Sequence, residues 1–275
     1  MRHTCPRVPY VVLSSLRIGF ISSYFRDHTI GNLTRGIIEH FSRDNFEVIV
    51  FRLPGAKDTV SETIDRTADK VVSLYQNLER DREIIEGEEL DILFYPDIGM
   101  DPYTYFLSFA RLAPVQAVTW GHPDTTGIPN IDYFISSELL EIPGASSHYS
   151  EQLIEMSHLP TFYYQPEFPK TQFTRDDFDL PKEGHIYICP QTLFKFHPEF
   201  DDILGELLRR DPDSHLILID YLGGGHWKRL LCERFDRVFP NVVDRVIFIP
   251  RMPREKYLGL LLLADAVLDI PAFSG

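Results

Sequence analysis

The chain has 275 residues, of which 44% are hydrophobic, so it can bury substantial cores as one large domain or two ordinary ones. Its 27 Lys and Arg residues face 41 Asp and Glu residues, a formal net charge of -14, which argues against a nucleic-acid surface because phosphate binding needs clustered cations. Three widely spaced cysteines suggest neither a disulfide framework nor a zinc site. The cysteine usage fits a reducing cytoplasm best. No run approaches the ~20 apolar residues of a membrane span.

In chain order, apolar runs first alternate with amphipathic stretches up to about residue 139. The pattern predicts a helix over 31–41 and another that closes over 106–111. Strands are predicted at 17–23, 46–51, 71–74, 90–95, 115–120 and in the DYFISS run from Asp132. This repetition predicts a parallel, doubly wound sheet. From 140 to 183 the sequence is rich in Pro, Gly and polar residues, and only fragments of strand are expected.

A second alternating series begins at His185. Strands are predicted at 185–189, 215–220, 245–250 and 266–270, and helices from 198, 227 and 254. The helix after Pro198 places one apolar face at Phe200, Ile203, Leu204, Leu207 and Leu208. We therefore expect an α/β chain in four parts, namely a lead-in over 1–16, a doubly wound domain over 17–165, a linker over 166–184 and a second, incomplete domain over 185–275. A last strand with an open edge predicts that the chain is a fragment.

Polar loops follow three of the predicted strands at their carboxyl ends, where open α/β sheets bind ligands and helix amino termini offer unpaired N–H groups. The loop YFRDHTIG follows the first strand, GHPDTTGIPN the fifth, and CPQTLFKFHP the strand from His185. Each is a candidate ligand site. The side chains concerned are His28, His122, Thr125, Thr126, Gln191, Thr192 and Lys195.

Five blocks of sequence resemble one known family in order and spacing. They are LRIGFISSYFRDHTIG, LAPVQAVTWGHPDTTGIPNIDYFISS, HYSEQLIEMSHLP, CPQTLFKFHP and RVIFIPRMPREKYLGLLLLADAVLDIPAFSG. The chain resembles the O-linked N-acetylglucosamine transferase family in its bacterial branch. The resemblance implies a GT-B fold of two tandem Rossmann-like domains. It also implies inverting transfer of N-acetylglucosamine from UDP-GlcNAc to Ser or Thr hydroxyls of a protein or peptide acceptor, with no metal and no other cofactor. The net charge and the short apolar runs predict neither a nucleic-acid nor a membrane partner.

The same resemblance implies roles for single residues. His28 matches an active-site histidine beside donor and acceptor, and Lys195 matches a lysine on the donor diphosphate, where a cation neutralises charge on the leaving group. Arg254 and Tyr257 match a lysine and a histidine near the uracil. Three positions depart from the animal members, since Thr192 stands for glutamine, Phe194 for tyrosine and His122, in a cleft-lining loop, for tyrosine. The family's Gly-x-Thr-Thr phosphate loop is expected after Gly275, so the donor site of this chain should be incomplete.

Several alternatives stay open from the sequence. His28 is the preferred general base because imidazole titrates nearest neutrality, but water or donor phosphate oxygens could instead take the acceptor's proton. The asparagine-modifying branch of the family, which uses UDP-glucose, is the nearest enzymatic alternative. A truncated, inactive module that binds UDP or a protein without turnover is the alternative from another class.

Overall fold

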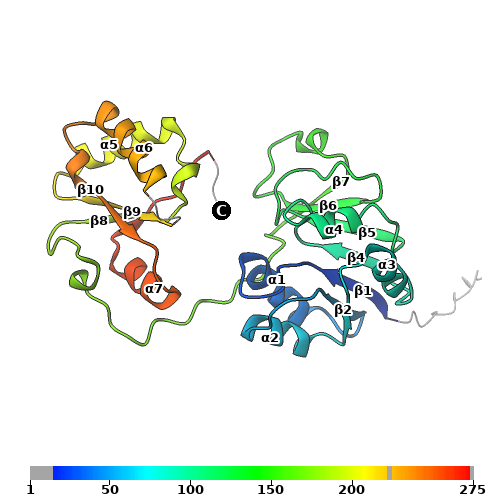
Figure 1. Ribbon diagram of the computed structural model, residues 1–275. Helices are drawn as coiled ribbons and strands as arrows, with labels where there is room; N and C mark the ends of the chain where they lie inside the picture. Colours follow the sequence, from blue (N-terminus) through cyan, green and yellow to red (C-terminus); the bar gives the residue numbers. More distant parts are fainter. Residues whose placement is uncertain (1–14, 222–224, 273–275) are drawn as a thin grey trace, which may run out of the picture. The chain divides into compact units, whose positions relative to one another are not determined.

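The computed structural model describes residues 15–221 and 225–272. The chain divides between Gln165 and Pro166 into two compact units, each with its own parallel sheet (Figure 1). The α/β prediction is confirmed in both units.

The first unit is a seven-stranded sheet in the order β3-β2-β1-β4-β5-β6-β7, and every neighbouring pair is parallel. Its strands are β1 (Leu16–Ile21), β2 (Phe46–Arg52), β3 (Lys70–Ser73), β4 (Ile92–Tyr95), β5 (Val115–Thr119), β6 (Tyr133–Ser137) and β7 (Gln152–Met156). Its helices are α1 (Thr29–His40), α2 (Thr59–Thr67), α3 (Leu78–Glu86), α4 (Pro102–Leu107) and the 3-10 helix η1 (Ala145–His148).

Strand alternation divides the core of the first unit into two layers. In β2, Val48 and Val50 join the buried cluster that includes α1 and α2 residues, whereas Ile49 and Phe51 join the cluster that includes α3 and α4 residues. Successive side chains of a strand point to opposite faces, so a continuous apolar run is what a sheet covered by helices on both faces requires.

The second unit is built in the same way on a smaller sheet. Its parallel strands lie in the order β10-β9-β8-β11. They are β8 (Ile186–Cys189), β9 (His215–Asp220), β10 (Val246–Pro250) and β11 (Ala266–Val267). The helices are α5 (Pro198–Arg210), α6 (His226–Val238) and α7 (Arg254–Leu263), with 3-10 helices η2 (Arg175–Phe178), η3 (Leu193–Lys195) and η4 (Val243–Arg245). One face of the sheet packs against α5 and α6, and the other against α7.

Four local predictions differ from the structure. The helix expected to close over 106–111 ends at Leu107, where the Ser108 backbone N–H makes the last helical hydrogen bond, to the Thr104 carbonyl. Ile203 is 54% exposed, since it lies at the margin of the apolar arc of α5. A complete strand, β7, occupies part of the segment where only fragments were expected. Strand β7 lies at the edge of the sheet and pairs with β6 through its backbone, so it does not need the regular apolar alternation by which strands are predicted. The last strand is only two residues long, Ala266–Val267.

A buried hydrogen bond crosses the point at which the first sheet reverses its strand order. Ser22, after β1, donates its Oγ hydrogen to Asp97 Oδ2 after β4 over 2.7 Å, and the Tyr24 backbone N–H donates to Ser22 Oγ. Asp97 Oδ1 is buried and has no partner among the described residues. Burial raises the pKa of Asp97 to about 7, against the lowering effect of the Ser22 hydrogen bond. Desolvation of a carboxylate disfavours its charged form.

An ion pair joins two helices of the second unit to the loop after β8. The Asp201 side chain, in the first turn of α5, is 1% exposed and that of Arg234 on α6 is 24% exposed. One guanidinium nitrogen of Arg234 lies 2.8 Å from Asp201 Oδ1 and also donates to the Phe196 carbonyl over 2.9 Å. Arg234 therefore holds the end of η3, one residue after Lys195.

Replacing Asp97 with asparagine should remove a pH dependence of stability. Between pH 4 and pH 7 the folded state keeps a proton on Asp97 that the unfolded chain has lost, so the free energy of unfolding of the wild type falls as pH rises. The substituted amide side chain does not titrate, so the difference in favour of Asp97→Asn should grow by up to about 4 kcal/mol over that range. Urea unfolding followed by Trp120 fluorescence in a Trp227→Phe background measures it. A difference that stays constant with pH would contradict the assignment, and Asp124→Asn at an exposed position controls for net charge.

Arg234→Ala should lower the free energy of unfolding of the second unit by about 3–5 kcal/mol, because it leaves the Asp201 carboxylate buried without its cation. Asp201→Ala combined with Arg234→Ala should cost less than the sum of the single changes. Urea unfolding followed by Trp227 fluorescence in a Trp120→Phe background provides the double-mutant cycle. Additive effects would show that the two side chains do not depend on each other.

Candidate active site

The loop after β1 ends on His28, which caps helix α1. Its Nδ1 accepts a hydrogen bond from the Ile30 backbone N–H over 3.2 Å. The ring stacks on Tyr24 with centroids 4.4 Å apart, and the Tyr24 hydroxyl donates to the Met100 carbonyl over 2.9 Å. Burial, and then the charge of Arg26, lower the pKa of His28. The structure thus places His28 beside the segment that follows β4.

Residues 96–101 after β4 form the centre of this region. Asp101 caps α4 by accepting from the Thr104 backbone N–H, and it also accepts from Ser23 Oγ over 2.9 Å, which ties the β1 loop to α4. Gly99 has φ +109°, and a Cβ there would stand 3.0 Å from the His122 ring. A glycine is needed for both reasons. The loops of His28 and His122 therefore both contact the segment after β4.

The two threonines of the loop after β5 are held by a residue that the sequence analysis did not single out. Thr125 Oγ1 donates to Glu151 Oε2 over 2.7 Å, and the Thr126 backbone N–H and hydroxyl both donate to Glu151 Oε1. Burial alone would raise the pKa of Glu151, but these hydrogen bonds lower it. Thr125 and Thr126 thus use their hydroxyls to fix the His122 loop. The sequence carries no signal for Glu151 beyond an acid next to Ser150, because its partners lie on a distant loop.

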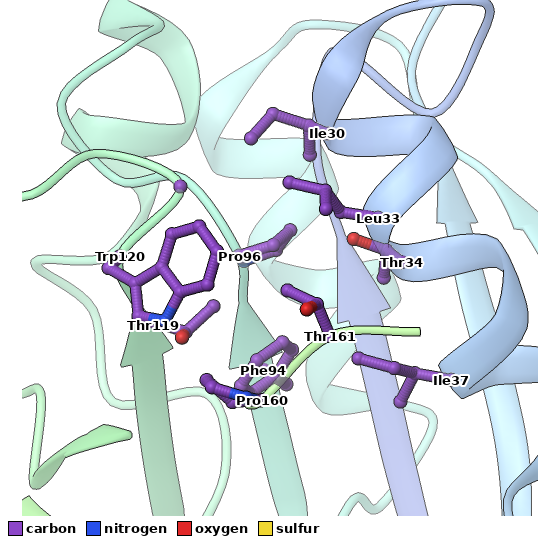
Figure 2. Close-up of a pocket in the computed structure, with 11 residues that line it drawn as sticks. Ile30, Leu33, Thr34, Ile37, Phe94, Pro96, Thr119, Trp120, Pro160 and Thr161 are labelled. Carbon is purple, nitrogen blue, oxygen red and sulfur yellow. The ribbon is translucent and has the colours of Figure 1, made fainter. Parts of the chain in front are cut away.

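A small pocket lies between α1, the ends of β4 and β5, and residues 160–161 (Figure 2). Ile30 and Leu33 line one side and the indole of Trp120 the other. Trp120 Nε1 and Thr161 Oγ1 are buried and have no hydrogen-bond partner among the described residues. The remaining lining residues are Thr34, Ile37, Phe94, Pro96, Thr119, Gly121 and Pro160. In the sequence this pocket is indicated only by the place of Trp120 between a predicted strand and a polar loop.

In the second unit the predicted donor residues lie around η3. The Lys195 backbone N–H donates to the Thr192 carbonyl over 2.9 Å, and the Thr192 N–H donates to Gln191 Oε1. Phe194 is 52% exposed, with its ring centroid 5.9 Å from that of Trp227. The short helix η3 thus places Lys195 and the exposed ring of Phe194 in the loop that follows the carboxyl end of β8.

Arg254 and Tyr257 lie on the first turn of α7, on the other face of the second sheet. Tyr257 packs against the buried cluster that contains Ile249 and Leu260, and burial raises the pKa of its hydroxyl. Its ring is thus partly used by the core.

Neither a metal centre nor a membrane helix is found in the part of the chain that the structure describes. Residues 15–221 and 225–272 contain no group of three or more His, Cys, Asp or Glu side chains placed to hold a metal ion. Over the same residues no helix combines the length and apolar character needed to cross a bilayer.

Solved structures share this fold. A mutant of the O-GlcNAc transferase of Thermobaculum terrenum superposes with a TM-score of 0.81 at 24% identity, covering 95% of this chain and 49% of that one. Anabaena HepE, solved with UDP and glucose, has a TM-score of 0.52 at 11% identity, covering 92% and 73%. At these identities the likeness establishes the GT-B type of fold alone.

Curated relatives and a family model identify the group of proteins. A probable UDP-N-acetylglucosamine–peptide N-acetylglucosaminyltransferase of Arabidopsis thaliana, SEC, is 28% identical over 94% of this chain and 27% of its own length. The UDP-glucose:protein N-beta-glucosyltransferase of Actinobacillus pleuropneumoniae serotype 5b is 33% identical over 83% of this chain and 36% of its own. The chain thus spans about a third of these relatives. The family model matches residues 8–168, across the His28 and His122 loops. The chain belongs to glycosyl transferase family 41.

Proposed function

We propose that this chain is part of an inverting glycosyltransferase that moves N-acetylglucosamine from UDP-GlcNAc to Ser or Thr hydroxyls of a protein. The observation that carries the proposal is the family 41 match over 8–168, which spans the loops around the crevice of the first sheet. The similarity of nearly the whole chain to a peptide N-acetylglucosaminyltransferase supports the choice of sugar and acceptor.

The proposed donor site is on the second unit. Lys195 would pair with the diphosphate of the donor, with Gln191, Thr192 and Phe194 beside it. A cation there stabilises the negative charge that develops on the leaving UDP. Arg254 and Tyr257 would contact the uracil, with Tyr257 offering the edge of a ring already packed into the core.

In the proposed reaction the first unit contributes His28 and His122 to the active site. Neither a metal nor a cofactor is required. We propose a cytoplasmic protein whose partners are a UDP-sugar and a protein or peptide acceptor. The acidic composition, with 41 Asp and Glu residues against 27 Lys and Arg residues, supports the absence of a nucleic-acid partner.

One observation favours a second candidate, a glucosyltransferase that modifies asparagine. The A. pleuropneumoniae UDP-glucose:protein N-beta-glucosyltransferase is 33% identical to this chain, more than the 28% of the plant relative, although over less of the chain. The two functions differ in the sugar and in the acceptor atom, so they make different products.

UDP should bind the purified chain saturably, and Lys195→Ala should weaken binding by tenfold or more, about 1.4 kcal/mol, because the substitution removes the phosphate cation. Isothermal titration calorimetry measures both affinities. Lys182→Ala, which removes an 81% exposed lysine, is the matched control and should bind like the wild type. An unchanged affinity for Lys195→Ala would remove that residue from the donor site.

Intact-mass analysis of acceptor peptides should separate the sugars. Peptides that contain either Ser and Thr or Asn are incubated with UDP-GlcNAc or with UDP-glucose. Addition of one N-acetylhexosamine to the Ser and Thr peptide is the expected result, because that pair matches the first proposal. Addition of one hexose to the Asn peptide would establish the second candidate. UDP binding with no product from any pair would leave the binding-only module.

A further inference from the structure

The hydrogen bond that caps α1 determines which nitrogen of the His28 ring carries a proton. The Ile30 backbone N–H is one of the donors that an α-helix leaves unpaired at its start, and it points at His28 Nδ1 over 3.2 Å. Because Nδ1 accepts this hydrogen bond, it holds no proton. A neutral imidazole then has its single hydrogen on Nε2.

The surroundings of His28 favour this neutral ring. Burial first, and then Arg26, lower its pKa. The positive end of the α1 dipole acts in the same direction. In the stacked partner, burial first, and then the charges of Asp101 and Asp97, raise the pKa of Tyr24. A histidine at a helix amino terminus in another enzyme, triosephosphate isomerase, is kept neutral in the same way and acts through its N–H.

We infer that His28 serves the transfer as a neutral hydrogen-bond donor through Nε2–H, and not as the general base that abstracts the acceptor's proton. The inference rests on the proposed function and assigns a role to one of its residues. Nε2 has no partner in the described parts of the chain, and the ring is fixed by the Ile30 cap on one atom and by the Tyr24 stack on one face. A donor held in place before reaction needs no reorganisation as charge develops on a substrate oxygen.

The chemistry balances without a proton transfer to His28. The acceptor atom forms a bond to the anomeric carbon of the sugar, and the bond from that carbon to the diphosphate oxygen breaks with its electron pair leaving on UDP. The acceptor's proton passes to a phosphate oxygen of the departing UDP or to water. The Nε2 hydrogen stays on His28 throughout.

The tautomer can be measured without any substrate. A long-range proton–nitrogen correlation spectrum of the nitrogen-15 labelled chain, recorded from pH 6 to pH 9, distinguishes a bare Nδ1 from a bare Nε2. His158 is the internal control, since its Nδ1 lies 3.2 Å from the Leu159 carbonyl oxygen, which only accepts, and must therefore carry a proton. His28 should show a proton on Nε2 and His158 a proton on Nδ1. A proton on Nδ1 of His28 at neutral pH would overturn the inference.

His28→Asn identifies the His28 signals by their loss and tests the role. Asparagine can still cap α1 through its side-chain oxygen, so the fold should be kept, which circular dichroism checks. The loss of one hydrogen bond to a charged oxygen should lower kcat/KM about ten- to hundredfold without changing the shape of its pH profile. A general base would instead give the wild type an acidic limb at the His28 pKa, and the variant would lack that limb.

Arg26→Gln adds a second check on the electrostatics. Removing this cation should raise the pKa of His28 in the NMR titration but leave the proton on Nε2 and leave the pH profile of kcat/KM in place. A profile that moves with the His28 pKa would show that the ring takes up the proton during the reaction. If no sugar is transferred under any condition, the proposed function fails. The NMR measurement needs no activity, so it still shows which ring nitrogen of His28 carries the proton.

Discussion

Parallel strand pairing is the constraint on which the candidate site depends. Every neighbouring pair in both sheets is parallel, so all carboxyl ends of a sheet meet at one edge. The strand order reverses beside β1 in the first unit and beside β8 in the second. Loops on either side of such a point diverge and leave a crevice for a ligand. The loops that carry His28 and Lys195 follow the two strands at which this reversal occurs, so each unit presents its main candidate residue from an equivalent place.

The same helix-capping arrangement follows the first strand of each sheet. His28 Nδ1 accepts from the Ile30 N–H at the start of α1, and His197 Nδ1 accepts from the Glu199 N–H at the start of α5. The loop that carries His28 is held by hydrogen bonds of the Ser22, Ser23 and Tyr24 side chains. In the second unit a buried ion pair has the holding role, because Arg234 binds the Phe196 carbonyl next to Lys195. Both candidate residues are therefore positioned by contacts that a ligand need not supply.

Much of the polar chemistry at the crevice is committed to the protein itself. Glu151 accepts hydrogen bonds from the hydroxyls of Thr125 and Thr126. Asp101 accepts from the Ser23 hydroxyl and from the Thr104 backbone N–H in the first turn of α4. Buried polar groups cost free energy unless they are paired, so these hydrogen bonds stabilise the loops. The hydroxyl and carboxylate groups that form them are then less available to bind a ligand. Asp97, Trp120 and Thr161 are exceptions, because each has one buried polar atom unpaired among the described residues. The site is thus a set of fixed loops, and few of its polar atoms are left for a substrate.

The sequence by itself determined the fold class, the two series of strands and helices, and the loops that carry His28, His122 and Lys195. These follow from local periodicity and from strand ends, which short stretches of chain encode. Only the tertiary structure decided which atoms those side chains use. Glu151 and Asp97 meet their partners across 25 and 75 residues of sequence, and the edge strand β7 exists because β6 is there to pair with it. A long-range partner leaves no local pattern, so the ring nitrogen that His28 offers could be read only from the folded chain.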